Sequence, residues 1–398
     1  MKYPSYNKNT VNKVIKVLKS GRVNYWTGNE CKKFESEFSK YIGNKYSVAV
    51  SNGSVALEIA LRALDLKKGD KIIVTPRSFI ISASCVINLQ YTPIFADVDS
   101  NGNLDFENIK KIYNKNVKAI ILVHLNGLSC DLDPIIKFAK KNKIYLIEDC
   151  SQAHGAVYKS KSVGSYGDIS TWSFCQDKII STGGEGGMIS TNNKKIWRKC
   201  WEQKDHGKNF KKIFKKNKKK NFGQFNWIHD NLGSNYRMTE MQAALGRIQL
   251  EKLDKQITKR NKIVDLYLLG LKDFFDKKIF KTPNFQCDSC EIKKFKIKCN
   301  YCVHAFYRLN LFFKKTNLIK RSKILKRLIN NGIKCGVGPC PEIYREKIFK
   351  KLKFNEKNRL INAKKLGETS IIFYINPNKS LVSIKKEILL IKKIIKNF

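Results

Sequence analysis

Residues 173–191 have the sequence SFCQDKIISTGGEGGMIST, in which a strand-like run is followed by a lysine, a glycine-rich strip and a second strand-like run. Most lysines of the chain stand in charged runs such as KKNKKK, whereas Lys178 has mainly apolar or uncharged neighbours, among them Phe174 and Ile179. A solvated surface lysine does not need that setting. A nucleophilic amine does, because removal of water from around a lysine lowers its pKa. We therefore predict that Lys178 is a reactive lysine.

Apolar strand patterns alternate with helical patterns around this stretch. Helices are predicted from about Ser54, after Asp133 as N-cap with Pro134 as the first helical residue, and from Thr239 onward. This alternation is typical of a mainly parallel α/β sheet flanked by helices. The strand-like runs are residues 45–52, 71–76, 93–99, 119–127, 144–150, 169–175 and 186–191.

A chain of 398 residues is long enough for two domains. We predict an N-terminal arm at residues 1–45, a large domain at 46–260 and a smaller C-terminal α+β domain at 261–398. The boundary follows the long helical pattern that starts at Thr239, beyond which the composition becomes more mixed.

The formal net charge of +45 raises the question of a nucleic-acid partner. The excess is nearly all lysine and comes with abundant Asn and Ile, residues that share AT-rich codons, so genome composition accounts for it. Proteins that read bases specifically favour arginine. We therefore expect no specific nucleic-acid binding.

Neither end of the chain predicts a membrane segment. The first ten residues, MKYPSYNKNT, lack the apolar core of a signal peptide, and the apolar stretch at 384–398 is interrupted by lysines. Eight scattered cysteines, including Cys85, Cys150 and Cys175, are expected to be reduced thiols. A cytoplasmic protein without membrane association is predicted.

The stretch SNGSVALE, residues 51–58, links a strand to a helix. Gly53 permits close approach of the backbone, the free N–H groups of a helix start favour a phosphate, and Ser54 adds a hydroxyl donor. An ordinary strand–turn–helix connection with a serine N-cap explains the same residues.

The stretch IYLIEDCSQAHGA, residues 144–156, places two carboxylates at the end of a buried strand. Carboxylates at the end of a buried strand need a cation or a hydrogen-bond donor as partner. A protonated pyridine nitrogen would be such a partner for Asp149. Gln152 and His154 follow closely and are candidates for contact with a ring hydroxyl. A solvent-facing strand end is the alternative interpretation.

The order of these features, a phosphate cradle, an acid at a strand end and a lysine before a glycine strip, matches enzymes that use pyridoxal 5′-phosphate. The sequence resembles the DegT/DnrJ/StrS family of nucleotide-sugar aminotransferases over nearly its whole length. The similar segments are YWTGNECKKFESEFSKYIGNKYSVAVSNGSVALEIAL, TPRSFIISASCV, IEDCSQAHGA, SFCQDKIISTGGEGGMIST and GSNYRMTEMQAALG. This resemblance implies the fold of type I pyridoxal-phosphate enzymes, with a seven-stranded sheet.

The resemblance also implies roles for individual residues. Lys178 would form the Schiff base with the cofactor and Asp149 would hold its pyridine nitrogen. The other implied cofactor contacts are Gly53, Ser54 and Ser173 near the phosphate, Phe79 and Gln152 against the ring, and Asn235 reaching the phosphate of the partner subunit's cofactor. Residues facing the sugar are expected within 26–28, 304–308 and 336–346.

Two departures from the family pattern stand out. The spacing from Lys178 to Glu185 is one residue longer than usual, through Gly183 and Gly184, and the spacing from Pro76 to Phe79 is one residue shorter. The second departure lies in the segment from which the resemblance assigns Phe79 to the ring.

The implied activity is transfer of an amino group from glutamate to a nucleotide-linked keto sugar by a homodimer, in the biosynthesis of lipopolysaccharide, O-antigen or capsule. A dehydratase or lyase on the same scaffold and a non-enzymatic regulator are the alternatives. Relatives that act as dehydratases replace the lysine by histidine, so Lys178 favours transamination.

A cluster of four cysteines, CDSCEIKKFKIKCNYC, does not belong to this pattern. Paired C-x2-C knuckles are typical of structural zinc sites. The short, lysine-rich spacer is unusual for such a site, and coincidence in a cysteine-rich chain is the alternative. The candidate ligands are Cys287, Cys290, Cys299 and Cys302.

Overall fold

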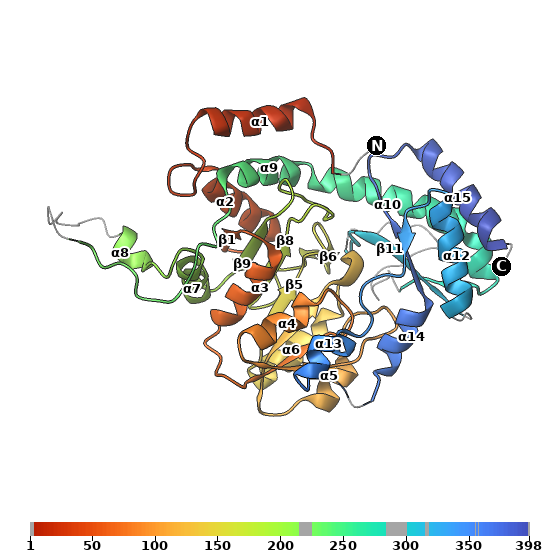
Figure 1. Ribbon diagram of the computed structural model, residues 1–398, viewed down its shortest axis with the longest axis horizontal. Helices are drawn as coiled ribbons and strands as arrows, with labels where there is room; N and C mark the ends of the chain where they lie inside the picture. The colour runs from red at the N-terminus through yellow and green to blue at the C-terminus, as the bar shows by residue number, and fades with distance from the viewer. Residues whose placement is uncertain are drawn as a thin grey trace.

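The computed structural model describes residues 4–214, 225–283, 301–314, 318–354, 356 and 358–396. In this part of the chain the larger sheet has the strand order β1-β9-β8-β5-β4-β2-β3 (Figure 1). The strands are β1 (Tyr46–Val50), β2 (Lys71–Val74), β3 (Thr92–Phe95), β4 (Val117–Val123), β5 (Tyr145–Asp149), β8 (Ile169–Ser173) and β9 (Gly187–Thr191). The pairs β2–β3, β2–β4, β4–β5 and β5–β8 are parallel, and β9 is antiparallel to both β1 and β8. The prediction of a seven-stranded, mainly parallel sheet is confirmed.

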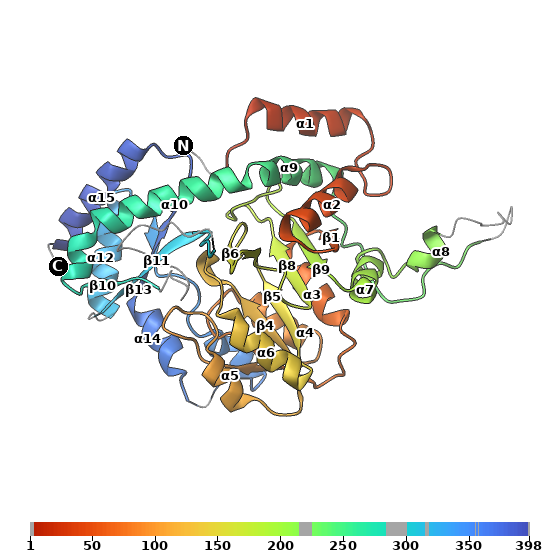
Figure 2. The same ribbon diagram turned by 180° about the vertical axis from the view of Figure 1, so that it is seen from behind.

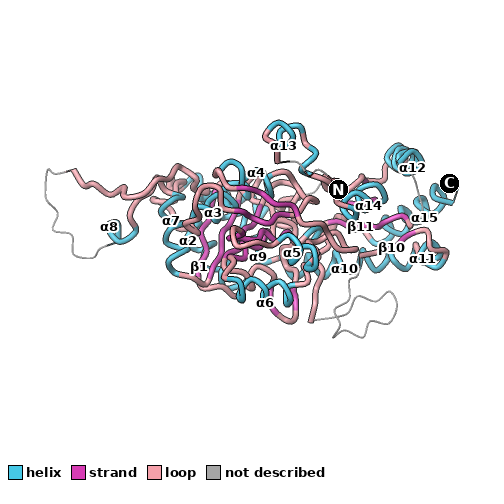
Figure 3. Tube along the Cα trace, turned by 90° about the horizontal axis from the view of Figure 1, so that it is seen from below, coloured by secondary structure: helices cyan, strands magenta, loops and turns pink. Residues whose placement is uncertain are grey.

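Helices cover both faces of this sheet, as Figure 3 shows from below. Residues alternate between the two faces: Ala119 and Ile121 of β4 pack on one side, Ile120 and Leu122 on the other. The first side is covered by α3 (Gly53–Arg62), α4 (Ile81–Asn88) and α7 (Lys194–Lys204). The second is covered by α2 (Glu30–Ile42), α5 (Phe106–Ile112) and α6 (Leu132–Asn142). Burial on both faces explains why β4 is apolar except at Lys118 and why β5 is apolar up to Glu148.

Two predicted helix starts had different outcomes. Helix α9 (Glu240–Glu251) begins after Thr239, whose hydroxyl accepts a hydrogen bond from the backbone N–H of Gln242 at 3.3 Å. The prediction of Asp133 as N-cap of α6 was wrong, because that helix begins at Leu132. Asp133 lies in the first turn, where its carboxylate forms an ion pair with Lys159.

A second, smaller sheet has the strand order β10-β11-β13-β12. Its strands are β10 (Phe280–Lys281), β11 (Arg308–Phe313), β12 (Cys335–Gly336) and β13 (Ser370–Tyr374). They share an apolar core with α10 (Leu253–Gly270), α12 (Leu318–Asn330) and α15 (Leu381–Lys396). Helices α9 and α10 run one after the other from the large sheet to the small one (Figure 2). The predicted domain boundary at residue 260 falls inside α10.

The remaining elements are short or peripheral. They are α1 (Lys8–Lys19), α8 (Phe210–Phe214), α11 (Lys272–Asp276), α13 (Lys347–Lys351), α14 (Ile361–Thr369), β6 (Val157–Tyr158), β7 (Lys161–Ser162) and the 3-10 turns Leu125–Gly127 and Ile343–Arg345. The segment around α8 projects away from the body of the molecule (Figure 1). Within the described ranges, no helix has the length and apolarity needed to cross a bilayer.

Candidate active site

A cavity of about 720 Å³ opens where the ends of β5 and β8 and the start of α3 face residues of the second sheet. In parallel α/β sheets, ligands bind at this carboxyl edge of the strands. The cavity is lined by most of the site residues predicted from the sequence, namely Gly53, Ser54, Phe79, Asp149, Gln152, Ser173 and Lys178. The structure therefore gathers side chains from four separate segments around one space.

The start of α3 and the end of β8 form one wall of this cavity. Asn52 caps the helix, since its Oδ1 accepts a hydrogen bond from the N–H of Val55 at 2.9 Å. Gly53 packs directly on Ser173: a Cβ at position 53 would lie 2.6 Å from the Ser173 Cβ. Ser173 Oγ accepts from the N–H of Cys175 at 3.4 Å, which leaves its hydroxyl proton available. Together with the N–H groups of the helix start, this hydroxyl favours a phosphate.

Asp149 lies at the end of β5 and is only 5% exposed. Its Oδ1 accepts a hydrogen bond from the N–H of Ser151 at 3.1 Å, and its Oδ2 accepts one from the hydroxyl of Ser82 at 3.4 Å. Gln152 lies beside it, with its Oε1 accepting from the N–H of Asn126 at 2.8 Å. That bond leaves the amide NH2 of Gln152 as the donor for a ligand.

Lys178 reaches the cavity from the loop between β8 and β9, and its side chain is 17% exposed. Its Nζ lies 3.4 Å from the hydroxyl of Tyr307 and 3.5 Å from Oδ1 of Asp177. The environment therefore differs from the apolar one expected from the sequence, because Phe174 and Ile179 belong to the core and do not line the cavity. Asp177 directly precedes Lys178 in the sequence, so this charged neighbour could have been predicted from residues 173–191.

Further lining residues come from the small sheet and the loop that follows β12. Arg308 is the first residue of β11 and Tyr307 directly precedes it, whereas Gly338, Pro339 and Cys340 lie after β12. They fall within the ranges 304–308 and 336–346 that were expected to face the sugar. Residues 26–28, the third such range, do not line this cavity.

The loop that carries Lys178 continues through the glycines that depart from the family spacing. Cys175 forms an isolated bridge with Gly184 across the loop. Gly183 and Gly184 have φ angles of +88° and +132°, a region that residues with a side chain rarely adopt. Both glycines of the predicted spacing difference therefore lie in the returning half of the loop, after the lysine.

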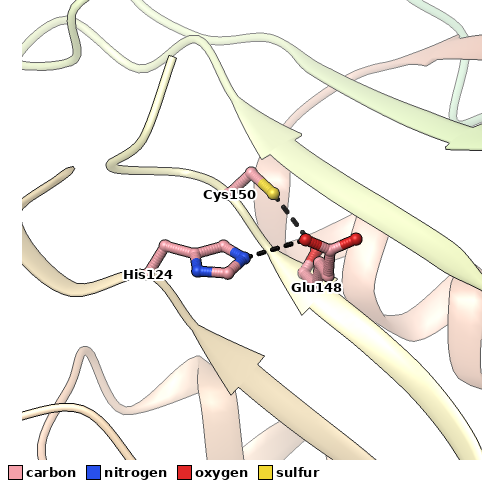
Figure 4. A group of neighbouring side chains, drawn as sticks. All are labelled: His124, Glu148 and Cys150. Atoms are coloured by element: carbon pink, nitrogen blue, oxygen red, sulfur yellow. Dashed lines mark hydrogen bonds and ion pairs between the residues drawn. The ribbon is translucent and has the colours of Figure 1, made fainter. Parts of the chain in front are cut away.

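Glu148, the carboxylate next to Asp149, points away from the cavity into a buried cluster with His124 and Cys150 (Figure 4). Its Oε2 accepts from His124 Nε2 at 3.0 Å, and its two oxygens also accept from backbone N–H groups at positions 164, 166 and 167 at 2.6–2.8 Å. Burial alone would raise the pKa of Glu148, but these hydrogen bonds lower it below its ordinary value.

This buried cluster has the residue types of a metal site. The N–H of Cys130 donates to His124 Nδ1 at 3.1 Å, which assigns the ring proton to Nε2, the atom that donates to Glu148. Burial also raises the pKa of the Cys150 thiol well above its ordinary value. The donors and acceptors of the cluster are thus satisfied without an ion, and we assign it a structural role.

Three of the residues predicted from the sequence lie differently from the rest of the site. His154 is buried against Trp172 and Phe174, with ring centroids 5.4 and 5.7 Å away, and is not among the residues that line the cavity. Phe79 lines the cavity but is 67% exposed. Asn235 is exposed, lies outside the cavity of its own chain and forms an isolated bridge with Asp205.

Of the four clustered cysteines, only Cys302 belongs to the described residues, and its sulfur accepts a hydrogen bond from the N–H of Lys159 at 3.5 Å. Cys287, Cys290 and Cys299 lie outside the described residues.

Known proteins resemble this chain in sequence or in structure. The chain is 39% identical to GDP-perosamine synthase of Escherichia coli O157:H7 over 60% of its own length and 62% of the length of that protein. An aminotransferase structure from Psychrobacter cryohalolentis superposes with a TM-score of 0.93 and 41% identity, covering 100% of this chain and 99% of that one. The E. coli GDP-4-keto-6-deoxy-D-mannose-3-dehydratase with bound hydrated PLP superposes with a TM-score of 0.82 and 25% identity over 97% of each chain.

The profile of the DegT/DnrJ/EryC1/StrS aminotransferase family matches residues 4–386, a range that contains every element from α1 to β13 and the first part of α15. The predicted resemblance is therefore confirmed: this chain belongs to the DegT/DnrJ/EryC1/StrS aminotransferase family.

Proposed function

We propose that this protein is a pyridoxal-phosphate-dependent aminotransferase that moves an amino group from glutamate to a nucleotide-linked keto sugar. The observation that carries the proposal is the arrangement of Lys178, Asp149 and the Gly53–Ser173 contact around one cavity. The names of relatives support the substrate class: they include GDP-perosamine synthase and a dTDP-3-amino-3,6-dideoxy-α-D-galactopyranose transaminase.

The residues of the cavity fit pyridoxal phosphate. Gly53 lies so close to Ser173 that any side chain there would be excluded, which leaves the backbone at the start of α3 open to a phosphate. A nearly buried carboxylate with only neutral partners, Asp149, suits the ring nitrogen. Lys178 supplies a primary amine within the same cavity.

The cofactor, when bound, supplies an aldehyde that condenses with amines and a ring that accepts an electron pair. Lys178 would hold the cofactor through its amine and, when free of it, would serve as the base that takes a proton from the donor Cα. Asp149 would hold the ring nitrogen. Ser173 and the N–H groups of α3 would hold the phosphate, and the NH2 of Gln152 would be available to the ring.

A homodimer is part of this proposal. Asn235, which lies outside its own cavity, would reach the cofactor phosphate of a second subunit. Near it in the sequence, Phe225, Trp227 and Leu232 are 74%, 81% and 94% exposed, and a second copy of the chain would cover such apolar side chains. The eight cysteines outside the cluster are thiols and not disulfides, which supports a cytoplasmic location.

The glutamate half-reaction tests the proposed activity directly. Purified protein loaded with pyridoxal phosphate is expected to release one equivalent of 2-oxoglutarate on addition of L-glutamate alone. Addition of GDP-, dTDP- or UDP-linked 4-keto-6-deoxy sugars should then yield an amino sugar that retains the nitrogen of 15N-labelled glutamate. Loss of water from the sugar without gain of nitrogen would identify a dehydratase, and no reaction with glutamate would contradict the proposal.

Structural zinc is proposed on the spacing of the four cysteines alone. Protein purified under reducing conditions is expected to contain about one zinc per chain by elemental analysis. The Cys302→Ser variant should lose it, whereas Cys340→Ser, a cysteine outside the cluster, should retain it. A metal content near zero in fresh, reduced wild-type protein would remove zinc from the proposal.

A further inference from the structure

A network of four side chains surrounds the amine of Lys178 and connects the two sheets. Asp177 and Lys178 belong to the loop after β8, whereas Arg308 is the first residue of β11 and Tyr307 directly precedes it. The hydroxyl of Tyr307 donates a hydrogen bond to Oδ2 of Asp177. Lys178 Nζ lies 3.4 Å from that hydroxyl and 3.5 Å from the other oxygen of Asp177. The two acceptors therefore hold the amine from two directions.

Arg308 fixes the orientation of the tyrosine in this network. Its Nη2 donates to the Tyr307 hydroxyl at 2.9 Å and to Asp177 Oδ2 at 3.2 Å. The guanidinium lies 4.6 Å from the ring centroids of both Tyr307 and Tyr374, so it is held between two aromatic faces. Because the tyrosine proton is directed at Asp177, the oxygen of its hydroxyl remains an acceptor for Lys178.

The pKa shifts of Asp177 and Tyr307 agree with these hydrogen bonds. Burial alone would raise the pKa of Asp177, but the charge of Lys178, the hydrogen bond from Tyr307 and the charge of Arg308 lower it. Burial raises the pKa of Tyr307, which keeps its hydroxyl protonated. The nearby His154 and Cys175 are neutral, since burial lowers the pKa of the first to about 3 and raises the pKa of the second.

We propose that Asp177 and Tyr307 are positioning residues that hold the amine of Lys178, once released from the cofactor, in the orientation needed for proton transfer. The inference rests on the proposed function, in which the lysine is released during each turnover. A flexible four-carbon side chain would otherwise sample many rotamers at that moment, and misplacement by about 1 Å can cost on the order of 100-fold in rate.

The Tyr307→Phe variant tests this role, because it removes the hydroxyl and keeps the ring. We expect kcat of the glutamate half-reaction to fall about tenfold while KM for glutamate stays within about twofold, since the groups that bind the donor remain. The matched control is Tyr158→Phe. That residue is 8% exposed, against 6% for Tyr307, and its hydroxyl donates to Asp131 at 3.1 Å, so it has similar burial and a similar bond away from the site.

Asp177→Asn provides the second measurement. This change also removes a negative charge beside the amine, so the variants are compared on the alkaline plateau of the pH–kcat profile, where the amine is neutral in each of them. A fall similar to that of Tyr307→Phe is expected there, and the double variant should lose little more than either single one, because both residues act on the same amine.

The outcomes separate this inference from the proposed function. Borohydride reduction of loaded wild-type protein, followed by peptide mass spectrometry, should place the cofactor on Lys178. If it does, and Tyr307→Phe and Asp177→Asn both keep kcat within about twofold of wild type, the positioning role is overturned while the proposed function stands. A rise in KM with unchanged kcat would also overturn it. If wild-type protein does not carry the cofactor on Lys178, both proposals fail.

Discussion

Replacing Lys178 with alanine (K178A) is expected to lower turnover by about 10³-fold or more, because the proposed reaction uses this amine both as nucleophile and as proton carrier. The fold should remain intact. The lysine side chain lies at the cavity and not in the core, and substitutions outside the core usually change stability by about 0.5 kcal/mol or less. Release of 2-oxoglutarate from glutamate measures the activity, and thermal unfolding measures the stability.

Lys159→Ala is the control for this prediction. Lys159 also pairs with an aspartate, Asp133, and is 37% exposed, but it lies away from the cavity. That variant is expected to keep wild-type activity. A K178A protein that still released 2-oxoglutarate at a rate close to that of wild type would show that another amine performs the reaction.

The second large effect is expected at Glu148, away from the chemistry. Glu148→Ala should destabilise the fold by about 3–5 kcal/mol, because it leaves buried His124 and three buried or partly buried backbone N–H groups without their acceptor. Urea unfolding at pH 7 measures the difference. The control is Glu107→Ala, which removes a glutamate that is 71% exposed and pairs only with Lys110 three residues away. We expect that variant to change stability by less than about 1 kcal/mol.

Because the pKa of Glu148 is lowered in the folded chain, the loss of stability in Glu148→Ala should depend on pH. A carboxyl group whose pKa is lower in the folded than in the unfolded chain adds stability above its unfolded pKa, which is about 4.5. This stabilising contribution disappears as the pH falls through the pKa of Glu148 in the folded chain, because the carboxyl group is then protonated in both states. The stability difference between wild type and Glu148→Ala should therefore be full at pH 7 and shrink below about pH 4.5. A difference that stayed constant far below that pH would contradict the assignment.

The sheet and most of the candidate site could be predicted from the sequence because their signals are local. Each buried strand is a short apolar run, and Gly53, Asp149 and Ser173 each stand at or just after the end of such a run. Parallel pairing brings strand ends to one edge, so their nearness follows from the strand pattern.

The contacts of Lys178 and Glu148 could not be predicted in the same way. Tyr307 reaches Lys178, and Arg308 reaches Asp177, only because the small sheet packs against the large one, across about 130 residues of sequence. The backbone donors of Glu148 come from a turn at positions 164–167 that has no apolar period. The error at Asp133 has a local cause: Asp131, two residues earlier, occupies the N-cap position, and the side chain of Asp133 pairs with Lys159.

The position of the two glycines after the lysine has a consequence for how such loops can vary. Chain length between the end of β8 and the amine determines where the amine sits, since Ser173 is anchored in the sheet only five positions earlier. On the return path, a Cβ at Gly184 would have no atom within 4 Å, so this side of the loop faces open space. Insertions and deletions among relatives should therefore accumulate downstream of the reactive lysine, and the upstream count should be nearly invariant.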